Sequence, residues 1–166
     1  MVIKMTGKNA GIFLLESKRI ILHPIPAHEP ADNGESQWYT IVEKHHHMPI
    51  GSIGMVHRHP EWRNTGIQIV ISNEETRGEG YALEALELLE RYIFDTLAYQ
   101  RIAVRIVDFD TAAIRLFKKA GYKLEGVQEQ GCRYNNRYYD FILLRLLRAE
   151  YLKRNNETLL FTRHMV

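Results

Sequence analysis

One amphipathic helix, set between two strand-like runs, constrains the fold more than any other feature of this sequence. Apolar residues repeat at three- and four-residue spacing and charged residues take the other face, which predicts a helix over about residues 80–98. The apolar stripe consists of Ala82, Leu86, Leu89, Ile93 and Leu97, and the polar face of Glu84, Glu87, Glu90, Arg91 and Asp95. The flanking runs GIQIVIS (66–72) and RIAVRIV (101–107) are rich in β-branched residues, so we expect strands there.

Further strands and a second helix complete the pattern. Apolar runs bounded by turn residues predict strands over residues 17–25, 37–43, 50–57, 122–130 and 137–147. The second helix is expected to begin at Asp110 as its N-cap and to end before Gly121, with an apolar stripe of Ala113, Ile114, Phe117 and Ala120. The segment 24–36 contains three prolines and reads as a loop. This order of elements predicts a mixed α/β sheet.

Length and composition indicate one domain. A chain of 166 residues with 45% apolar residues can bury one sizeable core. We expect a single domain over residues 1–166, with its core at about 17–151 and a short, fraying helical tail over 152–166. The net charge is +2, Cys132 is the single cysteine, and the sequence has neither a run of eighteen apolar residues nor a signal-peptide pattern. We therefore expect a cytoplasmic protein with no nucleic-acid or membrane partner.

The segment SNEETRGEGYAL (72–83) carries the most informative motif. A strand leads into a loop with Gly78 and Gly80, and the predicted helix follows at once. Glycines leave backbone N–H groups accessible, the helix N-terminus carries partial positive charge, and Arg77 adds a full charge, so the segment suits a phosphate or pyrophosphate. An ordinary strand-to-helix turn is the alternative. The P-loop and dinucleotide fingerprints both fail, because no Lys-Ser or Lys-Thr follows Gly80 and Leu83 replaces the third glycine.

The residues RGEGYA (77–82) fit the Q/R-x-x-G-x-G/A signature of the GNAT superfamily of acyl-CoA-dependent N-acyltransferases. The likeness continues in order over about residues 17–151 and is greatest for the branch of spermidine and ribosomal-protein N-terminal acetyltransferases. Four segments carry it: SKRIILHPI, TGIQIVISNEETRGEGYALEALELLERYIF, DFDTAAIRLFKKAGYKLEG and NNRYYDFILLRLLRAEY. The resemblance implies a mostly antiparallel central sheet with flanking helices and splayed fourth and fifth strands. The family usually has one or two helices between its first two strands, and the loop over residues 24–36 is a shortened connection that departs from this pattern.

The resemblance also implies an activity, namely transfer of an acetyl group from acetyl-CoA to a primary amine by direct attack in a ternary complex. A main-chain N–H near Ile71 is then the expected oxyanion donor, and a homodimer is expected. The strand residues implied to pair with the pantetheine arm are Val70, Ile71 and Ser72. The loop residues implied to hold the pyrophosphate are Arg77, Gly78, Glu79, Gly80, Tyr81 and Ala82. Asp110 and Phe117 occupy the remaining positions at which the family contacts the donor.

The catalytic acid and base are left unassigned by the sequence. The family commonly has a tyrosine seven residues after the position of Asp110, and Phe117 stands there with no proton to donate. Three readings stay open: the thiolate leaves unassisted or with water, another hydroxyl such as that of Tyr122 substitutes, or the protein is a slow or inactive acyl-CoA binder. Asp108 is a candidate base, with a solvated loop carboxylate as the alternative.

The acceptor side is expected to be open, or completed by another subunit, because only a short loop joins the first two strands. This favours a peptide or protein amine, although Glu29, Asp32 and Glu35 in the loop can attract a cationic small-molecule acceptor.

We expect no metal site. On an extended strand His57 and His59 would share a face, which suits a metal, but no third ligand is identifiable. Residues 45–47, three histidines, are expected at an exposed hairpin tip.

Two rival functions remain. One is a non-catalytic acyl-CoA-binding regulatory module on the same fold, which Phe117 favours. The other is a small nucleic-acid or protein-binding domain that uses Arg115, Lys118 and Lys119, a cluster that otherwise reads as a solvated helix face.

Overall fold

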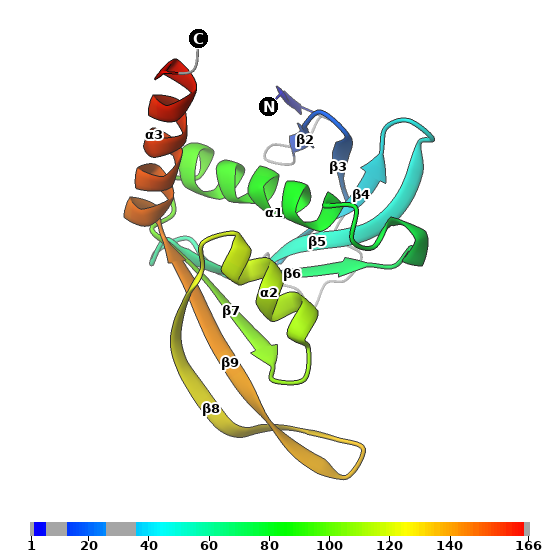
Figure 1. The fold of residues 1–166 in the computed structure, drawn as a ribbon, viewed down its shortest axis with the longest axis vertical. Helices are drawn as coiled ribbons and strands as arrows, with labels where there is room; N and C mark the ends of the chain where they lie inside the picture. Colours follow the sequence, from blue (N-terminus) through cyan, green and yellow to red (C-terminus); the bar gives the residue numbers. More distant parts are fainter. Residues whose placement is uncertain (1, 6–12, 26–35, 165–166) are drawn as a thin grey trace.

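The computed structural model describes residues 2–5, 13–25 and 36–164. Within these residues, nine strands form one sheet in the order β1-β2-β3-β4-β5-β6-β7-β9-β8 (Figure 1). The strands are β1 (Val2–Met5), β2 (Phe13–Glu16), β3 (Ile20–Pro24), β4 (Gln37–Glu43), β5 (Met48–His59), β6 (Asn64–Ile71), β7 (Arg101–Val107), β8 (Lys123–Tyr134) and β9 (Arg137–Leu147). All neighbouring strands pair antiparallel except β6 and β7, so the expected mixed, mostly antiparallel sheet is confirmed.

The parallel pair β6–β7 separates along its length. Its ladder joins Asn64 to Arg101, Thr65 to Ile102 and Gly66 to Ala103 and goes no further, although β6 runs on to Ile71 and β7 to Val107. On their other edges both strands stay paired, β6 with β5 and β7 with β9. The two strands therefore splay apart as the resemblance implies, and the facing edges of their C-terminal halves have no ladder partner in the part of the chain that the structure describes.

Helices α1 (Tyr81–Arg91) and α2 (Thr111–Lys119) lie on the same side of the sheet (Figure 1). A 3₁₀ turn, η1 (Glu74–Thr76), precedes α1, and a π-helical turn, η2 (Tyr92–Thr96), continues it. The predicted cap of α2 is confirmed, because the Asp110 carboxylate accepts the N–H of Ala113 at 3.0 Å. After the last turn of α2, Gly121 has φ +87°. Helices commonly end with a residue in this left-handed conformation, which glycine adopts at the lowest cost.

The core lies between the helices and the sheet. In α1 the predicted stripe residues Leu86, Leu89 and Ile93 are completely buried, and in α2 Phe117 is buried. The sheet contributes alternate residues, because side chains of a strand point to opposite faces. These are chiefly Leu22, Tyr39, Ile41, Ile53, Met55, Ile67, Ile102, Leu144 and Leu146.

Three features differ from the sequence prediction. The strands β1 and β2 were not expected, since their short runs lack a period that distinguishes strand from loop. Glu90 was expected on the solvent face of its helix, but it is completely buried because Arg154 covers it and pairs with it at 2.9 Å. The C-terminal helix α3 (Arg148–His164) has 17 residues and is longer than expected.

The first turns of α3 are anchored to the body of the protein. The hydroxyl of Tyr151 donates to Asp95 at 2.9 Å and its ring contacts Phe94. The predicted loop over residues 24–36 lies mostly outside the described residues. Within the described part, none of the helices combines the length and apolar character that a membrane span requires.

Candidate functional site

The glycine loop joins η1 to α1 beside the open end of the β6–β7 gap. Gly78 and Gly80 have φ values of +87° and +83°, the left-handed region that other residues enter at a cost. Gly80 is the N-cap of α1 and provides no side chain to bond the first-turn N–H groups, which the helix itself cannot pair. These N–H groups and the positive end of the helix dipole therefore form an anion-binding geometry.

Space in front of the loop is open. Among the described residues, a Cβ atom added to Gly78 would meet nothing within 4 Å, and one added to Gly80 would meet only Nη2 of Arg19, at 3.5 Å. A diphosphate group needs close approach to the backbone, which a side chain at either position would obstruct. The loop thus fits the pyrophosphate that its sequence predicts.

Arg77 precedes the two glycines and Glu79 lies between them, and both bond to neighbouring parts of the chain. The Arg77 guanidinium turns back to the Ile71 carbonyl, with Nε and Nη2 each 3.3 Å from the oxygen, and Nη1 lies 3.5 Å from Glu74. The carbonyl of Glu79 accepts from Nη1 of Arg19 at 3.0 Å. Arg77 is therefore tied to the end of β6, and its half-exposed charge stays near the loop.

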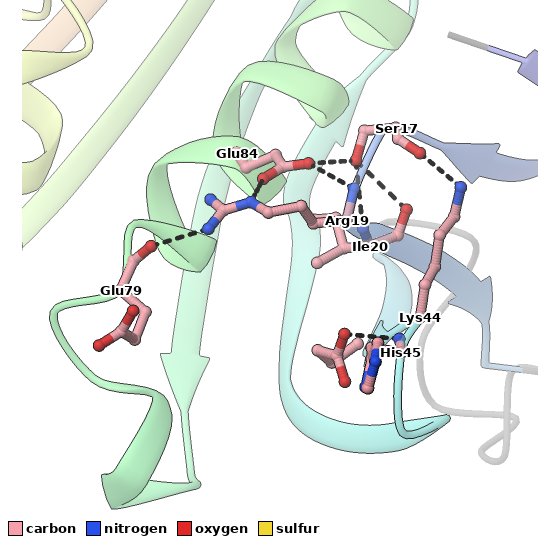
Figure 2. A network of polar contacts seen from close by, with 8 residues as sticks. Ser17, Arg19, Ile20, Lys44, His45, Glu79 and Glu84 are labelled. Carbon is pink, nitrogen blue, oxygen red and sulfur yellow. Dashed lines mark hydrogen bonds and ion pairs between the residues drawn. The ribbon is translucent and has the colours of Figure 1, made fainter.

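Arg19 and Glu84 were not singled out by the sequence, yet they form a polar network under the loop (Figure 2). Glu84, in the first turn of α1, accepts from Ser17 Oγ at 2.7 Å, from the Arg19 N–H at 3.0 Å and from Arg19 Nε at 2.6 Å. The Arg19 guanidinium also lies over the Tyr81 ring, 4.5 Å from its centroid. Burial alone would raise the pKa of Glu84, but the hydrogen bonds from Ser17 and Arg19 outweigh burial and lower it.

The three strand residues expected to contact the donor do not face the same way. The Ser72 N–H donates to the Ile50 carbonyl at 3.0 Å, and the Val70 carbonyl lies against Gly51, so both backbones face β5. Because hydrogen-bonding directions alternate along a strand, the N–H of Ile71 faces the gap toward β7. Of the three, Ile71 is the residue with an N–H group directed into the splayed region.

The Tyr122 hydroxyl, considered as a substitute for the family's catalytic tyrosine, is excluded as the acid. Tyr122 is 3% exposed and its ring contacts Phe117 edge-on, with centroids 5.0 Å apart. Burial and the neighbouring Glu90 carboxylate raise the pKa of Tyr122 well above its ordinary value. Tyr122 is therefore a core residue and cannot protonate a leaving thiolate. Phe117 is equally buried, and a contact between its ring and the donor stays a prediction.

The remaining candidates are Asp108 as a base and His57 and His59 as metal ligands. Asp108 is exposed at the end of β7, and its N–H donates to the Asp140 carbonyl at 3.0 Å. His57 has φ +49° at an irregularity in β5, which breaks the alternation expected to align it with His59. The His59 ring stacks on Trp62 instead, with centroids 4.7 Å apart. In the described part of the chain, no three His, Cys, Asp or Glu side chains come together as metal ligands do.

Two exposed features agree with the sequence. Residues 45–47 form the exposed tip of the β4–β5 hairpin. The basic residues Arg115, Lys118 and Lys119 are exposed on α2, as expected of a solvated helix face.

Comparison with known proteins identifies a family model that matches most of the core. Residues 16–123 match the family model of the acetyltransferase (GNAT) domain. An uncharacterized N-acetyltransferase, YokL, derived from the SPbeta prophage of Bacillus subtilis (strain 168), is 33% identical over 78 residues. This match covers 47% of the chain and only 44% of the length of that relative.

Solved structures share the fold. Mutant forms of the spermidine/spermine N-acetyltransferase SpeG from Vibrio cholerae superpose with a TM-score of 0.69 and 22% identity, over 75% of this chain and 71% of that one. A dodecameric structure of spermidine N-acetyltransferase from the same organism gives a TM-score of 0.67 and 24% identity, over 74% and 70% of the two chains. At this level of identity the likeness establishes the architecture and leaves the substrate open.

Proposed function

The chain belongs to the acetyltransferase (GNAT) domain family, and we propose that it is an N-acetyltransferase that transfers an acetyl group from acetyl-CoA to a primary amine in a ternary complex. The observation that carries this proposal is the open glycine loop at the N-terminus of α1, set beside the gap between β6 and β7. A phosphate-binding end and an unpaired strand edge together suit an extended substrate with a diphosphate group and an amide-containing arm.

In this proposal each part of the site has one role. The N–H groups of Gly78, Gly80, Tyr81 and Ala82 hold the pyrophosphate, whereas those of Arg77 and Glu79 already donate to the Glu74 and Thr76 carbonyls. The edge of β6 that faces the gap pairs with the pantetheine arm. The N–H of Ile71, whose carbonyl already accepts from Arg77, supplies the oxyanion donor for the thioester carbonyl. Asp110 contributes by capping α2, which lies beside the gap.

The chemistry requires few protein groups. The neutral amine attacks the thioester carbon, a C–N bond forms, and the C–S bond breaks to release CoA thiolate. The ammonium proton passes to water or to a base. Since Phe117 and Tyr122 donate no proton, the thiolate leaves unassisted or with water, which its conjugate-acid pKa of about 8.5 permits.

The acceptor is proposed to be a peptide or protein amine, or a small amine. The relatives from Vibrio cholerae act on spermidine by name, so polyamines belong among the candidates for this chain. Exposed aromatic residues, namely Phe109 just after β7 and Tyr134 and Tyr138 in the β8–β9 hairpin, gather where β7 ends, with the rings of Phe109 and Tyr134 in contact, and they favour an acceptor larger than a simple amine. We also propose that the protein acts in the cytoplasm as a homo-oligomer.

Thiol release tests this proposal. Purified protein is incubated with acetyl-CoA and a panel of spermidine, lysine and peptides with free N-termini. Amine-dependent release of CoA thiol, with acetylated product seen by mass spectrometry, is the expected result. Tight binding of acetyl-CoA without turnover of any amine would instead support the alternative, a non-catalytic acyl-CoA-binding regulatory module, which Phe117 favours.

A further inference from the structure

The guanidinium of Arg19 lies against the glycine loop in an unusually constrained way (Figure 2). Nε donates to Glu84 Oε2 at 2.6 Å, and Nη1 donates to the Glu79 carbonyl at 3.0 Å. The plane of the group covers the Tyr81 ring. Two nitrogens and one face of the guanidinium are thus engaged, and its orientation is fixed.

The third nitrogen, Nη2, is directed at the loop. It lies 3.5 Å from the position that a Cβ atom on Gly80 would take, which is the space left open for a ligand. Within the described residues Nη2 has no hydrogen-bond acceptor, and the Arg19 side chain is 41% exposed. Its N–H groups are therefore available to an anion that approaches Gly80.

Glu84 would oppose such an anion on its own. Its carboxylate lies in the first turn of α1, close to the N–H groups that bind phosphate, and like charges at this range repel. Hydrogen bonds from Ser17 and Arg19 keep the pKa of this carboxyl low, so it is ionised at neutral pH. The Arg19 cation offsets this charge, and the ion pair with Glu84 holds the guanidinium in place.

We propose that Arg19 is a phosphate-binding residue of this site, with Nη2 donating to the diphosphate held at Gly80, and that Glu84 is the residue that positions it. The inference rests on the proposed function, because the diphosphate is that of acetyl-CoA. It adds a residue from β3's entry turn, some 60 positions before the loop, to the binding site. It also assigns a role to the acidic side chain beside an anion site, because Glu84 orients the cation.

The test is a double-mutant cycle on acetyl-CoA affinity, measured by isothermal titration, with the melting temperature of each variant recorded. The variants are Arg19→Met, Arg19→Lys, Glu84→Gln and Arg19→Met/Glu84→Gln. A charge-assisted hydrogen bond corresponds to a loss of about tenfold or more in Arg19→Met. Arg19→Lys keeps the charge but cannot make three directed contacts, so we expect an intermediate loss.

The Glu84 variants distinguish a phosphate-binding role of Arg19 from a purely structural one. Glu84→Gln retains one side-chain oxygen that can accept from Arg19 Nε, so it keeps the guanidinium positioned while it removes the repulsion, and its affinity should stay within roughly threefold of the original. The double variant should bind more tightly than Arg19→Met, because the unopposed carboxylate is gone. Lys44→Met is the matched control. It removes a nearby cation that pairs with Glu16 at 2.6 Å and donates to the Ser17 carbonyl, and that within the described ranges bonds neither to Glu84 nor to the glycine loop, so the substitution should leave affinity unchanged.

Three outcomes would overturn the inference. One is unchanged affinity in Arg19→Met and Arg19→Lys. Another is an equal loss in Glu84→Gln and Arg19→Met with no recovery in the double variant, which would mean that the pair only fastens β3 to α1. The third is a loss confined to variants whose melting temperature falls; Arg19→Lys decides this if Arg19→Met does not fold. Failure of the unmodified protein to bind acetyl-CoA would instead refute the proposed function itself.

Discussion

The carboxyl group of Glu90 gives a sharp test of how the helices pack. Glu90 is completely buried where α1 meets the end of α2 and the C-terminal helix. Arg154 of α3 donates to it from Nη2 at 2.9 Å and also to the Ala120 carbonyl, so one cation joins all three helices. Burial raises the pKa of Glu90 from its ordinary value of 4.5 to about 7, even though the charge and hydrogen bond of Arg154 oppose the rise.

The raised pKa sets the sign and size of a pH effect. Between pH 4.5 and about 7 the folded protein retains a proton on Glu90 that the unfolded chain has released, so the free energy of unfolding falls as pH rises through this window. At about 1.4 kcal/mol per pH unit, the loss amounts to about 3 kcal/mol by pH 8. Glu90→Gln keeps the shape of the neutral carboxyl and abolishes this loss.

Urea unfolding followed by circular dichroism at pH 5, 6, 7 and 8 measures the effect. We expect Glu90→Gln to differ little from the original protein at pH 5 and to become the more stable of the two as pH rises, by up to about 3 kcal/mol. Glu129→Gln, at an exposed position of β8, should show no such trend. A difference that is constant with pH, or a Glu90→Gln variant that is less stable at pH 8, would refute the reasoning and indicate a stabilising charged pair with Arg154.

Three further predictions concern the caps and the loop. Asp110→Ala removes the side-chain bond to the Ala113 N–H and should lower the free energy of unfolding by about 1 kcal/mol in urea titrations; no change would mean that the cap is dispensable. Glu150 keeps a pKa of about 2 because bonds from Lys123, Arg145 and the Leu147 N–H outweigh burial. The stabilisation that Glu150 provides is therefore present above pH 4.5 and lost as pH falls toward 2. In Glu150→Gln the free energy of unfolding should fall by about 1 kcal/mol less over this pH range than in the original protein, a value reduced because the group is partly exposed. An unaltered acid transition in that variant would contradict this. Gly80→Tyr should abolish acetyl-CoA binding with an intact circular dichroism spectrum, and retained affinity would remove the loop from the site.

Local patterns predicted most of the sheet and both principal helices. The strands β4, β7 and β9 begin and end where their alternating or β-branched runs do, and the Asn135-Asn136 turn adopts the positive φ values that such a pair tolerates. The cap at Asp110 was equally visible, because a cap depends on residues three positions apart. The glycine loop could be located because its left-handed conformation depends on two glycines that are separated by one residue, Gly78 and Gly80.

Features that depend on distant contacts were not predictable in this way. Arg19 reaches the loop across about 60 residues, and nothing in SKRIILHPI indicates its partner. Glu90 looked solvated because helical periodicity describes one helix and takes no account of α3, which packs over it. Tyr122 could be judged core or catalytic only once its burial beside Phe117 was known.

Isothermal titration of the purified protein with acetyl-CoA, with CoA and ATP as comparisons, tests the central claim most directly. The account predicts micromolar binding of acetyl-CoA and of CoA, and none of ATP, because the site is built for a diphosphate joined to an extended arm. Absence of binding by acetyl-CoA and CoA would contradict the account and would show that the glycine loop is only a turn between strand and helix.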